Sequence, residues 1–169
     1  RARLALLLPR PLRPFCEGMT MQLSPNFTLA ELSKSETASR RGIDNTPPET
    51  AIAALRSLCK NVLEPIRAHF GRPVIVTSGY RSPAVNKRIG GSATSAHCYG
   101  FAADFTVPGV SNIDLCKWAV RNLQYDQIIY EFGESGWVHI AFKSDGNRNM
   151  ELSAKRIGGR TKYLEGIVS

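Results

Sequence analysis

The sequence predicts an α+β fold in which a small, mainly antiparallel sheet packs against one long core helix and several shorter helices. Three observations lead to this prediction. One long segment has apolar residues at helical spacing, several short segments are rich in β-branched and aromatic residues, and turn residues join these segments closely. With 169 residues, 43% of them hydrophobic, the chain has the size of one globular domain with a substantial core.

Two short segments have the pattern of a capping box, in which a hydroxyl and a glutamate three residues later satisfy free N–H groups at the start of a helix. The pairs are Thr28 with Glu31 and Thr46 with Glu49. We therefore expect a helix to begin at each of these two threonines.

The second of these helices is expected to form the centre of the core. From Pro47 onward its apolar residues recur every three or four positions, and Gly71 and Pro73 end the pattern. Pro65 is expected to bend the last turn, because its ring removes a backbone donor and crowds the preceding turn. The apolar stripe consists of Ile52, Leu55, Cys59, Val62, Leu63, Ile66 and Phe70.

The expected strands follow this helix and are short. Residues 74–77 and 101–107 each predict one strand, 127–132 and 137–142 predict a hairpin, and 150–165 predict a second hairpin. Two helices are expected between the strands. One follows the turn residues after the first strand, and the other is capped by a serine in the sequence Ser-Asn-Ile-Asp.

The charge gives limited information about partners. The formal net charge is +8, of which residues 1–20 carry +3 and the rest +5. A basic protein of this kind suits an anionic cell envelope as a partner. We expect no nucleic-acid partner, because the basic residues are scattered and form no aromatic-interleaved patch or known motif.

Residues 1–20 are expected to be a non-native or disordered leader, with residues 21–169 forming a single domain. The apolar run at 4–8 is shorter than the ~7 to 15 residues of a secretory h-region, so we expect no intact signal peptide. No apolar run approaches the ~18 residues of a membrane span, so we expect no transmembrane segment. The four cysteines show no C-x-x-C pairing and are expected to be reduced thiols.

Two of the three histidines, His97 and His139, lie in segments rich in small and polar residues near the expected ends of strands. Strand alternation places Asp104 and His139 on polar faces, so they can meet across the sheet. Two imidazoles and one carboxylate match the three protein ligands of a catalytic zinc site, which keeps a fourth position for water. The spacing alone is a weak signal, and purely structural histidines remain the alternative at this point.

Longer motifs around these residues resemble a known family. They are Ser-x-His-x-x-Gly-x-Ala-x-Asp at residues 95–104, Trp-x-His at 137–139 and Ser-Gly-Tyr-Arg-Ser-Pro-x-x-Asn at 78–86. Together they resemble the D-Ala-D-Ala carboxypeptidase family of zinc peptidases, over residues 27–142. That family includes phage endolysins and vancomycin-resistance dipeptidases, and the hedgehog signalling domain shares its fold.

The resemblance implies one Zn²⁺ ion bound by His97, Asp104 and His139, and the hydrolysis of peptide bonds in peptidoglycan stem peptides. Residues 21–169 would then form a single zinc peptidase domain. Its activity would be that of a D,D-carboxypeptidase or of an endolysin-type endopeptidase, and it would use a metal-activated water.

Two glutamates are candidates for the general base, which the family places shortly before its last histidine. We favour Glu131, which ends an expected strand and looks like the corresponding hedgehog-fold segment. Glu134, in the expected hairpin turn, is the alternative. Many family members carry an acidic residue three positions before the histidine, where this chain has Gly136. An ordinary solvated glutamate is the remaining interpretation of either residue.

Three further residues match substrate-contact positions of the family. Arg81 is expected to hold a substrate carboxylate or to polarise the scissile carbonyl, a task that suits the planar guanidinium. Ser95 and Tyr80 resemble substrate-binding positions, although for Tyr80 a packing role is an equal alternative.

The leading interpretation is therefore an enzyme, and the alternative is a catalytically inactive, zinc-containing module of the same fold that binds the cell wall. The missing acid at Gly136 is what supports the alternative. For either function we expect a monomer that is made in the cytoplasm and acts at the cell wall or in the periplasm.

Overall fold

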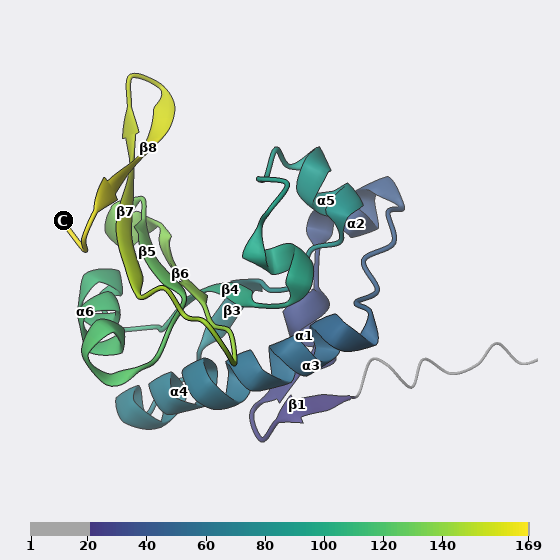
Figure 1. Ribbon diagram of the computed structural model, residues 1–169, viewed down its shortest axis with the longest axis horizontal. Coiled ribbons are helices and arrows are strands. Elements are labelled where there is room, and N and C mark those ends of the chain that lie inside the picture. Colours follow the sequence, from purple (N-terminus) through teal and green to yellow (C-terminus); the bar gives the residue numbers. More distant parts are fainter. Residues whose placement is uncertain (1–20, 169) are drawn as a thin grey trace, which may run out of the picture.

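A six-stranded sheet with a long helix across one face dominates the computed structural model, which describes residues 21–168 (Figure 1). The expected leader at residues 1–20 lies outside the described residues. A separate two-stranded ribbon, β1 (Gln22–Ser24) and β2 (Phe27–Thr28), precedes the first helix. The large sheet has the order β3-β4-β6-β5-β7-β8, with β3 Ile75–Ser78, β4 Ala102–Thr106, β5 Gln127–Glu131, β6 Trp137–Ala141, β7 Met150–Ile157 and β8 Arg160–Glu165.

The helices lie before and between the strands, as the sequence predicts. Two short helices follow the ribbon, the long helix follows them, and the remaining helical segments connect strands of the large sheet. They are α1 (Leu29–Ser33), α2 (Glu36–Arg41), α3 (Glu49–Leu58), η2 (Cys59–Leu63), α4 (Glu64–Phe70), α5 (Pro83–Arg88), η3 (Ala96–Tyr99), α6 (Asn112–Asn122) and η4 (Gly133–Ser135).

One of the two expected capping boxes is present. The Thr28 hydroxyl accepts the Glu31 N–H, and the Glu31 carboxylate accepts the Thr28 N–H, so α1 begins as predicted. The prediction for Thr46 is wrong, because its hydroxyl and its N–H both donate to the carboxylate of Asp44. Pro48, whose backbone is extended, takes the N-cap position of α3 and keeps Thr46 outside the first turn.

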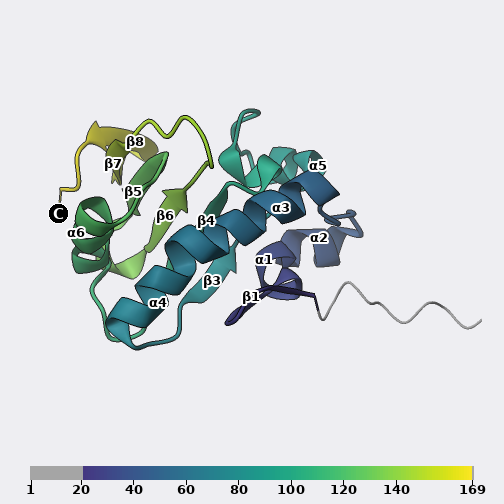
Figure 2. The same ribbon diagram turned by 60° about the horizontal axis from the view of Figure 1, so that its bottom comes forward.

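The predicted core helix is continuous from α3 through η2 to α4, and Figure 2 shows it running across the sheet. Its middle part, η2, is a π-helical turn in which the N–H of Glu64 donates to the carbonyl of Cys59. Pro65 follows at once, so the helix accommodates the missing donor and the bulk of the proline ring by widening the preceding turn. Gly71, in the left-handed conformation with φ of 60°, ends the helix as expected.

The large sheet is mainly antiparallel, which confirms the predicted fold class. Both predicted hairpins, β5–β6 and β7–β8, are present, and the β5–β7 pair is parallel. The sheet has one apolar face, which the core helix and α6 cover. Its core residues are Ala103, Phe105, Ile128, Tyr130, Val138 and Ile140.

The opposite face carries polar side chains. Asp104 of β4 lies directly across from His139 of β6, and Glu131 of β5 lies across from Trp137. The alternation read from the sequence therefore holds, and it leaves this face of the sheet for chemistry. Within the part of the chain that the structure describes, no helix is both long and apolar enough to cross a membrane.

Candidate metal centre and its cleft

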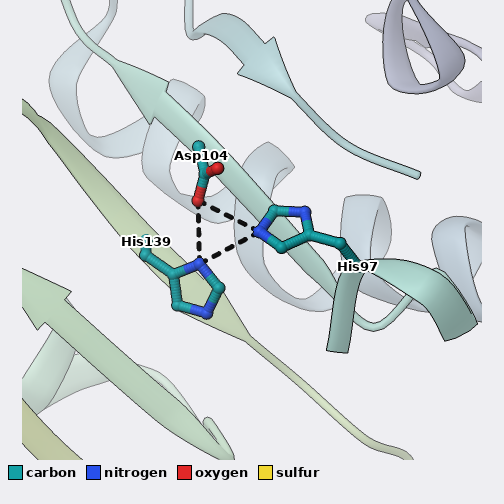
Figure 3. A group of neighbouring side chains, drawn as sticks. All are labelled: His97, Asp104 and His139. Carbon is teal, nitrogen blue, oxygen red and sulfur yellow. Dashed lines mark hydrogen bonds and ion pairs between the residues drawn. The ribbon is translucent and has the colours of Figure 1, made fainter. Parts of the chain in front are cut away.

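His97, Asp104 and His139 converge at one point on the polar face of the sheet, as Figure 3 shows. The Nδ1 atom of His139 lies 2.8 Å from Oδ1 of Asp104, and the Nε2 atom of His97 lies 3.2 Å from the same oxygen. The two ring nitrogens are 3.2 Å apart. All three side chains are buried. The structure thus brings together the three residues that the motifs single out.

Two different local structures deliver these side chains. The β4–β6 pairing places Asp104 and His139 opposite each other. His97 comes from the short 3₁₀ helix η3, which ends at Gly100 in the left-handed conformation with φ of 76°. A Cβ atom at Gly100 would collide with the backbone of Ala51 in α3, so both the conformation and the close approach require glycine here.

The orientation of the His97 ring is fixed by the backbone. Its Nδ1 atom lies 2.6 Å from the carbonyl oxygen of Gly79, within the Ser-Gly-Tyr-Arg motif. A carbonyl only accepts hydrogen bonds, so Nδ1 carries the proton and Nε2 directs its lone pair at Asp104 and His139. This arrangement is typical of a histidine that binds a metal ion.

The spacing of the three atoms fits a tetrahedral metal ion. Ligands about 2.0 to 2.1 Å from a tetrahedral zinc ion lie about 3.3 Å from one another. The observed separations of 2.8, 3.2 and 3.2 Å are close to that value. Since the Nε2 lone pair of His97 faces a second nitrogen and a carboxylate, a shared cation would satisfy all three groups. The donor set of two imidazoles and one carboxylate suits zinc.

The charges in the group also suit a cation. Burial lowers the pKa of His97, against the opposing effect of Asp104. The lowered pKa favours the neutral imidazole that a metal requires. Burial alone would raise the pKa of Asp104, but His97 and His139 outweigh it and hold this pKa well below its usual range. Asp104 is therefore a carboxylate at neutral pH.

The two candidate glutamates have different surroundings. Glu131 lines the same cleft as the three converging residues, and burial together with the charge of Asp104 raises the pKa of its carboxyl, against His139 and Arg81. The Glu134 carboxylate instead accepts the backbone N–H groups of Asn112 and Ile113 at 2.7 and 3.0 Å and the Tyr130 hydroxyl at 2.8 Å.

Glu134 thus satisfies the first free N–H groups of α6, together with the expected N-cap residue Ser111, whose hydroxyl accepts from Asp114. Burial would raise the pKa of Glu134, but these hydrogen bonds hold it below its ordinary value. The geometry favours Glu131 as the residue that faces a substrate.

Gly136, where many relatives carry an acid, is in contact with the backbone of Glu131. A Cβ atom at position 136 would overlap the carbonyl oxygen of Glu131. The turn between β5 and β6 is closed too tightly for any side chain at this position, so the absence of an acid there follows from the shape of the turn.

The three expected substrate-contact residues lie in different places. The Arg81 side chain is only 19% exposed, its guanidinium lies 3.9 Å from the Asp104 carboxylate, and its buried Nε atom has no hydrogen-bond partner. Ser95 lines the cleft beside His97. Tyr80 is 4% exposed and belongs to the hydrophobic core, which favours packing over substrate contact for its side chain.

The cleft also contains residues that the sequence patterns did not single out, among them Arg148 and Tyr163. Arg148 also donates to the buried carboxylate of Asp126, as does Lys143, and so fastens the loop between β6 and β7 to the sheet. Both Arg148 and Tyr163 lie beyond the stretch that carries the motifs. Predicting that Tyr163 reaches the cleft requires the register in which the second hairpin pairs with β5, and that register cannot be read from the sequence.

Two comparisons with known proteins agree with this site. Residues 25–141 match the family model of peptidase M15. The chain is also 34% identical over 108 residues to the zinc D-Ala-D-Ala carboxypeptidase of Streptomyces albus G. That alignment covers 62% of this chain and 40% of the relative, so the chain matches less than half of that protein's length. The resemblance noted from the motifs is confirmed: this chain belongs to the peptidase M15 family.

Proposed function

We propose that this chain is a zinc peptidase that hydrolyses peptide bonds in the stem peptides of peptidoglycan and acts at the cell wall. The observation that carries the proposal is the convergence of His97, Asp104 and His139 beside the carboxylate of Glu131 in one cleft. The zinc D-Ala-D-Ala carboxypeptidase that the chain partly matches supports this choice of metal and substrate.

His97, Asp104 and His139 would hold one zinc ion through Nε2, a carboxylate oxygen and Nδ1 respectively. When bound with an open fourth position, zinc lowers the pKa of water and polarises a substrate carbonyl. The Gly79 carbonyl would keep His97 in the tautomer that leaves Nε2 free.

Glu131 is proposed as the general base. Its carboxylate would take a proton from the attacking water and then give it to the leaving amine, which the reaction must protonate. The raised pKa of this partly buried group brings it closer to neutral pH, where one carboxyl can perform both transfers well.

Arg81 is proposed to bind the oxygen on which negative charge develops, or a carboxylate of the substrate. Its buried Nε donor has no partner within the described residues, so it is available for such an oxygen. A guanidinium in a site with little water is well suited to stabilise that charge. Ser95, beside His97 in the cleft, is proposed to contact the substrate backbone.

The proposed setting is that of an endolysin-type enzyme or a related wall carboxypeptidase, working as a monomer. The excess positive charge supports a location at an anionic envelope. The alternative, a zinc-containing module that binds the wall without cutting it, drew its support from the missing acid at Gly136. The shape of the turn now accounts for that glycine.

The test is mass spectrometry of purified stem peptides and of intact peptidoglycan after incubation with the zinc-loaded protein. Chelated protein and the zinc-loaded His139→Ala variant are the controls, and bound zinc is counted by elemental analysis. We expect close to one zinc per chain and new fragments that vanish with either control. One bound zinc without any fragment would reject the enzyme in favour of the binding module.

A further inference from the structure

The cleft continues on both sides of the converging residues. Arg81, Asp104 and Trp137 line two adjoining hollows, of about 690 and 450 Å³. The first arm, as we call the larger hollow, lies over β3 between α2 and α5. The second arm lies over β6 and β5 and ends at Arg148 and Tyr163. Figure 1 shows α2 and α5 on one side of the molecule and the β7–β8 hairpin on the other.

The two arms together cross the sheet from one edge to the other. The sheet order runs from β3 to β8, which corresponds to five strand spacings of about 4.8 Å, or about 24 Å. An extended peptide covers that distance with about seven residues at ~3.3 Å each. Asp104 and His139 lie on the second and third strands of this order, so the converging residues are inside the cleft and away from its ends.

From this geometry we infer that the cleft binds an extended peptide on both sides of the bond to be cut, and that the enzyme is an endopeptidase. The inference rests on the proposed function, which it narrows. A carboxypeptidase needs a group that holds the free carboxylate and closes the cleft just beyond the reacting bond. Arg81, the best carboxylate ligand near the site, lines both arms and closes neither.

The second arm is lined mainly by polar side chains, which suit a peptide backbone. Trp137, Glu131, Ala154 and Tyr163 lie side by side on four adjacent strands, β6, β5, β7 and β8. Desolvation, Glu131 and Asp104 raise the pKa of Tyr163, so its hydroxyl stays protonated and can donate to a substrate carbonyl.

The first arm is more apolar and suits side chains of the substrate. Val76 and Val85 line it, together with Ile89, which is 46% exposed, and Lys34 and Glu36 add charges of both signs. Apart from Arg81, which both arms share, the only cation that the described residues of this arm offer a terminal carboxylate is Lys34, and Glu36 accompanies it. Its volume, larger than that of the second arm, would be unused by an enzyme that removes a single residue.

Three synthetic peptides built around the bond identified by fragment mapping test the inference. The first has three residues on each side of that bond. The second ends one residue after the bond with a free carboxylate, and the third begins one residue before it. We expect kcat/KM for the first peptide to exceed that of each shortened peptide by about tenfold or more, because each arm contributes binding energy. Equal or faster hydrolysis of the second peptide would overturn the inference and leave the proposed function intact.

Variants at the two ends of the cleft sharpen the test. Ile89→Ala should lower kcat/KM for the full peptide about tenfold, as expected for lost apolar contact. Ile75→Ala is the matched control, because Ile75 has the same 46% exposure and lines neither arm. Tyr163→Ala should also lower kcat/KM for the full peptide, and Tyr163→Phe shows how much of this loss is due to the hydroxyl.

The two arms should hold opposite halves of the substrate. Ile89→Ala is expected to slow the hydrolysis of one shortened peptide and Tyr163→Ala that of the other. Slower hydrolysis of the same shortened peptide by both variants would contradict the inference.

A binding measurement tests contact with the substrate independently of activity. In the Glu131→Gln, Trp118→Phe variant, Trp137 is the one tryptophan left. Its fluorescence should respond to the full peptide at lower concentration than to either shortened one. The absence of any fragment in the mapping with the zinc-loaded wild type would reject the proposed function itself.

Discussion

Gly136 lies against the backbone carbonyl of Glu131, at a distance that leaves no room for a Cβ atom. The residue that lacks a side chain and the glutamate that faces the cleft are therefore parts of one tight turn. The carboxylate in the cleft comes from the end of β5, five residues before the position where many relatives carry their acid.

Replacing Gly136 by alanine or aspartate should destabilise the fold and should not increase activity. Relieving the overlap requires the turn to shift, at a cost of about 2 to 3 kcal/mol in the free energy of unfolding. Urea titration measures this cost, and Ser135→Ala is the control, since Ser135 is exposed in the same turn and makes only one long hydrogen bond there, to the Phe132 carbonyl at 3.4 Å. Higher activity of Gly136→Asp, at unchanged stability, would show that the turn accepts the acid.

Replacing Glu131 by glutamine should abolish most of the hydrolysis and leave zinc binding unchanged. The amide keeps the shape of the side chain but cannot take a proton, so kcat should fall by about 10² to 10⁴-fold. Stem-peptide hydrolysis and zinc content are measured on the same preparation. Near-normal turnover by a fully zinc-loaded variant would exclude Glu131 as the base.

The corresponding change at Glu134 should affect stability and not the chemistry. Glu134→Gln removes the negative charge that accepts the N–H groups of Asn112 and Ile113, which should cost about 1 to 2 kcal/mol. Thermal unfolding gives the loss of stability, and turnover is measured well below the unfolding temperature. A stable Glu134→Gln protein without activity would reverse the roles assigned to the two glutamates.

Arg81→Lys should retain the fold and lose activity. A lysine keeps the charge but cannot present a planar fork of donors, so kcat/KM should fall by about 10² with little change in zinc affinity. Arg88→Lys, on α5, is a suitable control outside the cleft. If Arg81→Lys retained full activity, the role of Arg81 would be limited to its charge.

Asp126→Asn should lower the stability in a way that depends on pH. Burial would raise the pKa of Asp126, but Arg148 and Lys143 outweigh it and hold this pKa below its ordinary value. A depressed folded-state pKa adds stability that is present above the unfolded value of about 3.9 and is lost as the pH falls through the folded value.

We therefore expect Asp126→Asn to cost about 2 to 3 kcal/mol at pH 5 to 8, with the gap from wild type narrowing below pH of about 4. Denaturant titrations at several pH values measure it. A gap that stays constant down to pH 2 would assign the effect to packing and not to charge.

Much of the fold could be predicted because its signals are local. The apolar stripe from Ile52 to Phe70 identified the core helix, and strand alternation placed Asp104 and His139 on one face. The capping box at Thr46 failed because the two following prolines keep the backbone extended, although the residue types fit. A pattern of residue types is therefore less reliable than a periodic pattern over many residues.

The parts of the site that depend on long-range register could not be predicted. Tyr163 reaches the cleft because β7 pairs in parallel with β5, and no local pattern specifies that pairing. The choice between Glu131 and Glu134 likewise depends on which of the two carboxylates accepts the N–H groups at the N-terminus of α6. The motifs identified the three residues that could hold a metal ion, because those residues lie in short, distinctive segments.

The hydrogen bond between the Gly79 carbonyl and His97 links metal loading to the packing of the first helix. The next residue, Tyr80, donates its N–H to the carbonyl of Leu32 in α1, so one short segment holds both the imidazole and the helix. If zinc binds as proposed, free zinc at about 100 times its dissociation constant would stabilise the native state by about 2.7 kcal/mol. Metal supply would then set how long α1 stays docked on the sheet, and the chain would be easiest for proteases to attack before it acquires its ion.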